Sequence, residues 1–285
     1  MSGRCDYIVL GVDGLLAGQV CSLLRGKGLK LRAFARKDFD LTSIQASTHR
    51  ETLRDAVVLN CAAFNAVDRA EVDPEVAFAV NGRAPAALAE LAGRLIHFST
   101  DYVFDGGAFS PYTEDAVPAP LSAYGRSKLE GERGVLSRPG HAVLRVACLY
   151  GKNGRAFGSL ILGMLRKGQR VRADAERRVQ PTWARAVAEQ TLVVVDEGLS
   201  GLFHSTCQGD TTWADFAEEL ARLSGHDVRL IDRVAASSIG TAKRPGYSVL
   251  QNRALQALGL DRMPHWRTAL EGYLASELDD GETTA

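Results

Sequence analysis

The chain has 285 residues, of which 46% are hydrophobic and 24% charged, a composition that excludes disorder over most of its length. Lys plus Arg and Asp plus Glu both number 34, and this zero net charge argues against a broad nucleic-acid-binding surface. The five cysteines form no Cys-x-x-Cys pair, which argues against a disulfide framework or a zinc ribbon. Because the sequence carries neither a signal-peptide pattern nor an apolar run of about 18 residues, we expect a cytoplasmic protein without a membrane-spanning helix.

The first half of the chain predicts strands that alternate with helices. The predicted strands are Tyr7–Leu10, Leu29–Phe34, Ala56–Cys61, Arg94–Phe98 and His141–Val146. The helical stretches between them run from Gly11 to about Leu24 and over Ser43–Leu53, Pro74–Asn81 and Pro85–Ala92. This alternation is typical of parallel β-α-β units, so we expect an α/β fold with a Rossmann-type doubly wound parallel sheet.

The second half of the chain is less regular. Its helix-like stretches are Ala156–Lys167, Trp183–Glu197, Thr212–Leu223 and Arg262–Leu278, and Leu202–Ser205 predicts a strand. The polar residues 279–285 predict a flexible tail.

A glycine-containing turn follows the first predicted strand. Gly11 and Gly14, with Asp13 between them, have the spacing G-x-x-G-x-x-A that ends at Ala17. Glycines there let the backbone approach a pyrophosphate, and the N-terminus of the following helix favours the anion. An ordinary strand–helix turn is the alternative.

Two cations follow the second predicted strand. Arg36 and Lys37 stand where NAD-binding proteins carry an acidic residue for the ribose 2′-hydroxyl. We therefore favour NADPH as the cofactor, with NADH and a merely solvated charge pair as the alternatives.

Two further motifs carry groups suited to carbonyl chemistry. Tyr124 and Lys128 are four residues apart, so they share one face if Ser122 caps a helix there. The ammonium would lower the pKa of the phenol, and the phenol would donate a proton to a carbonyl oxygen that accepts hydride. Thr100 and Asp101 follow the fourth predicted strand, where a hydroxyl can polarise a substrate carbonyl or merely cap the loop.

Over nearly its whole length the chain resembles the dTDP-4-dehydrorhamnose reductases, a branch of the extended short-chain dehydrogenase superfamily. The stretches that carry the resemblance are 60–63 (NCAA), 66–71 (AVDRAE), Asn81, 99–106 (STDYVFDG), 124–128 (YGRSK), 181–182 (PT), 201–204 (GLFH), 212–213 (TW) and 244–245 (RP).

The resemblance implies reduction, by NADPH or NADH, of the 4-keto group of a nucleotide-linked 4-keto-6-deoxyhexose, with dTDP as the expected nucleotide, in deoxysugar or rhamnose biosynthesis. Tyr124 would protonate the alkoxide, Lys128 would hold the nicotinamide ribose, and Thr100 would bind the keto oxygen. The implied substrate-binding residues are Thr100, Asp101, Val103, Phe104, Cys148 and Arg244. The implied cofactor-binding residues are Gly11, Asp13, Gly14, Leu15, Leu16, Arg36, Asp40, Leu41, Cys61, Ala62, Ala63, Phe98, Tyr124 and Lys128.

The resemblance also implies a smaller C-terminal α/β region that binds the nucleotide-sugar. We expect the dinucleotide-binding domain to comprise 1–148, with returns near 179–204 and 239–254. The substrate domain would comprise 149–178, 205–238 and 255–278. A homodimer is left open, and no motif indicates a metal, a nucleic acid or a membrane as a partner.

Two departures from the family pattern concern the substrate. Cys148 stands where these reductases usually place a Trp that packs on the sugar, and this loss leaves room for a differently shaped sugar. Arg177 and Arg178 replace part of the usual segment before Pro-Thr, where they would grip a diphosphate or remain solvated.

Two rival functions remain. The regulatory subunit of methionine adenosyltransferase resembles the same family and binds NADP without catalysis, although Asp101 favours a catalytic role here. A nucleotide-sugar epimerase would use the same residues without net consumption of cofactor.

Overall fold

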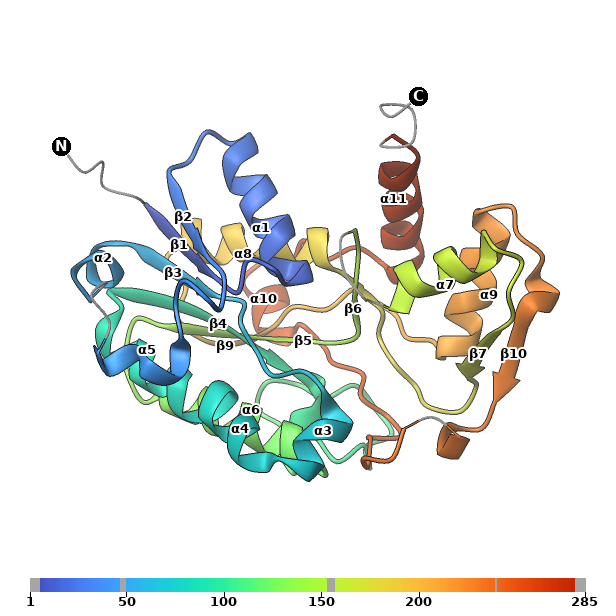
Figure 1. Cartoon of the computed structure of the whole chain (residues 1–285), viewed down its shortest axis with the longest axis horizontal. Coiled ribbons are helices and arrows are strands. Elements are labelled where there is room, and N and C mark those ends of the chain that lie inside the picture. Colours follow the sequence, from blue (N-terminus) through green and yellow to red (C-terminus); the bar gives the residue numbers. More distant parts are fainter. Residues whose placement is uncertain (1–5, 47–49, 153–156, 239, 280–285) are drawn as a thin grey trace.

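A six-stranded parallel sheet forms the centre of the larger part of the molecule (Figure 1). The structure is a computed structural model that describes residues 6–46, 50–152, 157–238 and 240–279. The strand order is β2-β1-β3-β4-β5-β9. The strands are β1 (Tyr7–Leu10), β2 (Leu31–Phe34), β3 (Val57–Asn60), β4 (Arg94–Thr100), β5 (Ala142–Val146) and β9 (Gly201–His204). The order reverses at β1, so the carboxyl ends of β1 and β3 meet at the topological switch point, where open α/β sheets bind ligands.

Helices cover both faces of this sheet (Figure 1). Tyr7 and Val9 of β1 pack into one apolar cluster with α1 (Leu15–Gly26) and α8 (Ala184–Asp196). Ile8 and Leu10 pack into a second cluster with residues of α2 and α5 on the opposite face. The helices drawn on this side are α2 (Arg50–Asp55), α3 (Val67–Val72), α4 (Pro74–Phe78), α5 (Ala84–Leu91) and α6 (Ala123–Leu136). Burial on both faces explains why the central strands are continuous apolar runs.

A smaller α/β region lies beside the main sheet (Figure 1). It contains the parallel pair β7 (Val171–Asp174) and β10 (Ile231–Val234), with α7 (Phe157–Leu165) and α9 (Trp213–Leu223). A second short pair joins β6 (Leu149–Tyr150) to β8 (Thr182–Trp183), and α10 (Arg253–Ala257) and α11 (Trp266–Asp279) complete the helices of the described residues. The predicted fold class is therefore confirmed: a Rossmann-like parallel sheet with smaller C-terminal α/β sheets.

The predicted elements are largely present, and the differences have local causes. Either Thr211 or Thr212 could cap α9 by sequence; in the structure Thr212 is the cap, and its hydroxyl accepts from Asp215 N at 3.0 Å. The single helix predicted over Ser43–Leu53 is wrong: a 3-10 helix over Leu41–Ala46 precedes α2, and 47–49 lie outside the described residues. The helix predicted over Pro74–Asn81 ends at Phe78 and continues as a π-helical turn over Ala79–Arg83.

Several segments were not predicted as elements at all. The short strands β6, β7, β8 and β10 and the short helices α3 and α10 were missed. Of the predicted tail, Asp279 ends α11, whereas 280–285 lie outside the described residues. Among the described helices, none is long and apolar enough to cross a bilayer.

Candidate active site

A cavity of about 330 Å³ opens at the switch point between β1 and β3. Predicted cofactor residues that line it are Gly11, Asp13, Gly14, Arg36, Asp40, Leu41, Cys61, Ala62 and Ala63. Leu10, Phe39, Thr42, Phe64, Asn65 and Val80 also line it and were not predicted. The cavity therefore joins the turn after β1, the segment after β2 and the segment after β3 into one site.

Gly11 is required by the close approach of two of these segments. Its φ is +81°, and a Cβ atom there would lie 2.8 Å from the backbone of Ala62. Gly14 follows as the N-terminal flank of α1, with the extended angles φ −85° and ψ 154°. The turn thus leaves backbone N–H groups and a helix N-terminus facing the cavity side of the sheet, which suits a pyrophosphate.

Arg36 and Asp40 supply opposite charges at this cavity. The Asp40 carboxylate accepts from the Thr42 backbone N–H at 2.9 Å and from the Thr42 hydroxyl at 2.7 Å. These hydrogen bonds lower the pKa of Asp40, so the carboxylate is ionised and already held by its neighbour. Arg36 is the cation that lines the cavity, whereas Lys37 does not line it.

Thr100 lies at the carboxyl end of β4, where the strand gives way to a 3-10 turn over Asp101–Val103. Its hydroxyl accepts from Tyr102 N at 3.2 Å and donates to Asp101 Oδ1 at 3.0 Å. The same hydroxyl lies close enough to the Tyr124 phenol to lower its pKa. The structure therefore brings together two residues that are 24 positions apart in the chain.

Tyr124 lies in the first turn of α6. As predicted, Ser122 caps this helix, and its hydroxyl accepts from Gly125 N at 3.1 Å. Glu71 of α3 adds a second cap, because its carboxylate accepts from Ala123 N at 2.7 Å. The helix start, and with it the position of Tyr124, is thus fixed from two sides.

The expected effect of Lys128 on the phenol is wrong for this structure. Burial raises the pKa of Tyr124 to about 12, although the nearby Thr100 hydroxyl opposes the rise. The Lys128 ammonium instead donates to the Phe98 carbonyl oxygen at 2.5 Å. Tyr124 is therefore a protonated phenol at neutral pH, which is the form a proton donor needs.

Lys128 is almost fully buried beneath this site. Burial lowers its pKa to about 8, while the carboxylate of Glu132 opposes the change. Its Nζ also lies 3.5 Å from Nε2 of the buried His97. Sequence reasoning assigned His97 no role, because a lone histidine on an apolar strand is more often a packed core residue.

Asp101 and Cys148 lie close enough to Tyr124 to raise its pKa. Burial raises the pKa of Asp101 to about 6, and its Oδ2 atom has no hydrogen-bond partner among the described residues. Cys148 follows β5 with φ +46°, in the left-handed region that residues other than glycine rarely adopt. Burial raises the pKa of its thiol, so it is a small neutral side chain beside the carboxyl.

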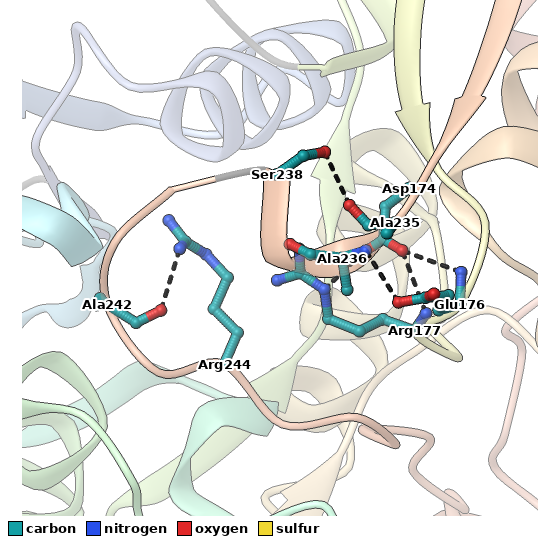
Figure 2. A network of polar contacts seen from close by, with 8 residues as sticks. All are labelled: Asp174, Glu176, Arg177, Ala235, Ala236, Ser238, Ala242 and Arg244. Carbon is teal, nitrogen blue, oxygen red and sulfur yellow. Dashed lines mark hydrogen bonds and ion pairs between the residues drawn. The ribbon is translucent and has the colours of Figure 1, made fainter.

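Arg244 is tied to the larger part of the molecule. Its guanidinium donates to both carboxylate oxygens of Asp68 on α3, at 2.6 and 3.3 Å. It also donates to Ala242 O at 3.2 Å (Figure 2). These bonds, and those from Thr241 N and Ala242 N, hold the pKa of Asp68 well below its usual range. Arg244 also interacts electrostatically with the side chain of Tyr102. One carboxylate of α3 therefore holds the loop that contains Arg244, close to the segment after β4.

The adjacent residues Arg177 and Arg178 form ion pairs with different carboxylates. Arg177 binds the Asp174 carboxylate and donates to Ala236 O at 3.0 Å (Figure 2). Its positive charge acts to lower the pKa values of Tyr102 and Cys148, so Arg177 lies near the same site. Arg178 instead pairs with Asp210 at the surface. Only Arg177 of this pair is thus placed near the predicted substrate residues.

Other predicted residues lie away from open space. Val103 and Phe104 are fully buried in a small apolar cluster with Tyr112. Phe104 stacks on Tyr112 with ring centroids 4.1 Å apart. Leu16 is buried on α1, and neither Leu15 nor Phe98 lines the cavity. These side chains support the site from behind.

The sequence and fold of the chain are similar to those of known nucleotide-sugar reductases. Residues 6–278 match the family described as RmlD substrate binding domain. A dTDP-4-keto-6-deoxy-D-glucose reductase of Streptomyces niveus is 37% identical over 93% of this chain and 94% of its own. A dTDP-4-dehydrorhamnose reductase of Streptomyces griseus is 35% identical over 94% and 92%. The crystal structure of a dTDP-4-dehydrorhamnose reductase from Bacillus anthracis in complex with NADP superposes with a TM-score of 0.90. It is 26% identical and covers 96% of this chain and 100% of that one.

Proposed function

The chain belongs to the RmlD substrate-binding-domain family of dTDP-4-dehydrorhamnose reductases, and from that membership we propose that it is an NADP-dependent 4-ketoreductase. Its substrate is a dTDP-linked 4-keto-6-deoxyhexose, and the reaction belongs to deoxysugar biosynthesis. The observation that carries the proposal is the Thr100 hydroxyl beside the protonated Tyr124 phenol, with the buried Lys128 one helical turn away.

The residues of the chain divide the chemistry among them. A reduced nicotinamide, when bound, supplies hydride to the keto carbon. Thr100 turns its hydroxyl hydrogen from Asp101 Oδ1 to the keto oxygen and stabilises the negative charge that develops there. Tyr124 gives its phenolic proton to that oxygen, so the product is an alcohol and the phenol becomes a phenolate. Burial of the site keeps bulk water from competing for these hydrogen bonds.

We assign the sugar and the diphosphate to the surroundings of Asp101, Cys148, Arg177 and Arg244. The unpartnered Oδ2 of Asp101 suits a sugar hydroxyl, because buried polar atoms are normally hydrogen-bonded. Cys148 beside it is smaller than the Trp that these reductases usually place there, which suits a differently shaped sugar. Arg177 and Arg244 supply the cations that a diphosphate needs, and the smaller α/β region would enclose the nucleotide.

Arg36 is proposed to select NADPH over NADH through the 2′-phosphate. Replacing Arg36 by Ala removes the cation that lines the cavity. We expect the preference for NADPH, measured as the ratio of kcat/KM values, to fall by roughly 10- to 100-fold, because charge-assisted hydrogen bonds contribute about 1.5–3 kcal/mol. Arg32→Ala is the matched control, since Arg32 is an exposed residue of β2 outside the cavity. An unchanged ratio in Arg36→Ala would contradict the assignment.

Turnover of defined substrates tests the function itself. Oxidation of NADPH is followed by absorbance with dTDP-4-keto-6-deoxyhexoses of both configurations at C5. We expect one equivalent of NADPH to be consumed for each sugar reduced. Epimerisation without net NADPH oxidation would contradict the reductase. So would tight NADPH binding without turnover, together with stoichiometric recovery of an enzyme partner.

A further inference from the structure

A buried polar chain runs from β3 through β4 to the lysine of the active site. Asn60 Nδ2 lies 3.2 Å from His97 Nδ1, and His97 Nε2 lies 3.5 Å from Lys128 Nζ. All three residues are at most 2% exposed. His97 and Asn60 have neighbouring positions on paired strands, since His97 is the register partner of Asn60. No step of the proposed reaction uses either residue.

The hydrogen bonds of Asn60 determine which nitrogen of His97 carries the proton. Asn60 Oδ1 accepts from the Ala62 backbone N–H at 3.3 Å, and a backbone N–H can only donate. The amide nitrogen of Asn60 is therefore the atom that faces the imidazole, and it donates to Nδ1. Burial and the nearby Lys128 lower the pKa of His97 well below its usual value, so the ring is neutral. A neutral ring that accepts at Nδ1 carries its hydrogen on Nε2.

The Nε2–H group then faces the nitrogen of Lys128. A neutral amine can accept a hydrogen bond from it, whereas an ammonium has no lone pair to do so. His97 in this tautomer therefore favours loss of the lysine proton. The Phe98 carbonyl, which accepts from Nζ at 2.5 Å, and the Glu132 carboxylate act in the opposite direction. His97 therefore favours the neutral amine of Lys128, whereas the Phe98 carbonyl and the Glu132 carboxylate favour the ammonium.

We propose that His97, oriented by Asn60, is a positioning residue that sets the proton affinity of Lys128 and holds its Nζ beneath the reaction site. This inference deepens the proposed function, on which it rests for its catalytic meaning. The titratable and charged groups around Lys128 are Tyr124 and Glu132 of its own helix and His97 of β4. Arg145 of β5 acts through Glu132, which it binds bidentately. Among these groups, only His97 presents a donor to the lysine nitrogen.

The consequence is a measurable pH dependence. Burial lowers the pKa of Lys128 to about 8, against the opposing effect of Glu132. The ammonium is then present below about pH 8 and is lost as the pH rises through that value. Activity that requires the ammonium is expected to decline on the alkaline side of the same pH. A change that turns an acceptor toward Nζ should move this decline to higher pH.

Two variants turn an acceptor toward Lys128 by different routes. In His97→Gln, the side-chain amide can direct its oxygen to Nζ. In Asn60→Asp, a carboxylate oxygen replaces the amide nitrogen and accepts from Nδ1–H, which leaves the Nε2 lone pair facing Lys128. We expect both to raise the titration midpoint of Lys128 by roughly half a unit to one unit. The alkaline limb of the kcat profile should move by a similar amount.

His141→Gln is the matched control. His141 is also a buried histidine, but its Nδ1 accepts from Leu95 N at 3.1 Å and its Nε2 donates to Ala89 O at 2.9 Å. Its replacement should lower stability and leave the Lys128 midpoint unchanged. Either active-site variant that folds is sufficient for the comparison.

The experiment is NMR titration of the full chain with ¹³C-labelled lysine, with the Lys128 signal assigned from Lys128→Met. Raised midpoints in the folded variants, and an unprotonated Nδ1 in the ¹⁵N spectrum of His97, would support the proposal. Unchanged or lowered midpoints, or an Nδ1–H tautomer in the unaltered protein, would overturn it. The titration needs no sugar substrate, so an absence of ketoreductase turnover would refute the proposed function and leave this result standing.

Discussion

Replacing Tyr124 by Phe is expected to lower kcat by about 100- to 10,000-fold, the usual contribution of a positioned general acid. The variant loses one hydroxyl, which is the proton donor beside Thr100. Because the phenol in the unaltered protein has a pKa of about 12, it stays protonated over the working pH range. Thr100 can hydrogen-bond the keto oxygen but, as an alcohol, is a far weaker acid than the phenol and does not give up its proton.

The measurement is single-turnover reduction of the dTDP-linked 4-keto sugar, together with titration of NADPH binding. We expect NADPH affinity to change little, so the loss lies in kcat. Tyr112→Phe is the matched control, since its hydroxyl accepts from Gly106 N and Ala108 N and donates to Asp105 in a loop behind the site. That variant keeps the ring stacked on Phe104 and should retain kcat. Full turnover by Tyr124→Phe would refute the mechanism.

Replacing Glu132 by Ala is expected to cost about 3–5 kcal/mol of stability, the typical effect of removing one partner of a buried ion pair. Arg145 donates to Glu132 through Nε at 2.9 Å and Nη2 at 2.7 Å, and both side chains are 2% exposed. Arg145 also lies 5.0 Å from the centre of the Phe104 ring and 3.4 Å from His204 Nε2. The variant leaves a guanidinium buried among β5, β9 and α6 without its counter-ion.

Urea unfolding, followed by circular dichroism, measures this change as a lower midpoint at an unchanged slope. The control is Glu90→Ala, which removes the partner of Arg138 in a pair about half exposed to solvent. Its expected cost is below about 1 kcal/mol, because solvent screens such pairs. Equal losses in the two variants would contradict the special weight given to the buried pair. A Glu132→Gln/Arg145→Met double variant should recover part of the loss, since it buries no unpaired charge.

The sequence by itself determined the elements whose signals are local. The strand–helix alternation of the first half predicted the parallel sheet, because period and turn residues are read within a few positions. The capping position of Ser122 followed from its place before the Tyr124–Lys128 turn, and the structure has that hydrogen bond. The glycine spacing likewise placed the cofactor cavity at the end of β1.

The short strands of the smaller region were not predicted, because they are defined by long-range pairing and not by local sequence. β7 and β10 have four residues each and pair across 60 positions of sequence, Val171 with Ile231. Strands this short carry too few residues for a period, and only the pairing defines them. The same holds for Phe39, Thr42 and Val80, which reach the cavity because separate segments fold against one another.

Charge states were decided by the tertiary structure alone. The residue types at 124 and 128 predicted a phenol with a lowered pKa, but burial raises that pKa and directs the ammonium to the Phe98 carbonyl. Asp68 and Arg244 lie 176 positions apart and bind each other, which no spacing rule indicates. The sequence specifies which groups can react, since chemistry belongs to side chains. Their proton affinities and partners depend on desolvation and on long-range contacts, which exist only once the chain has folded.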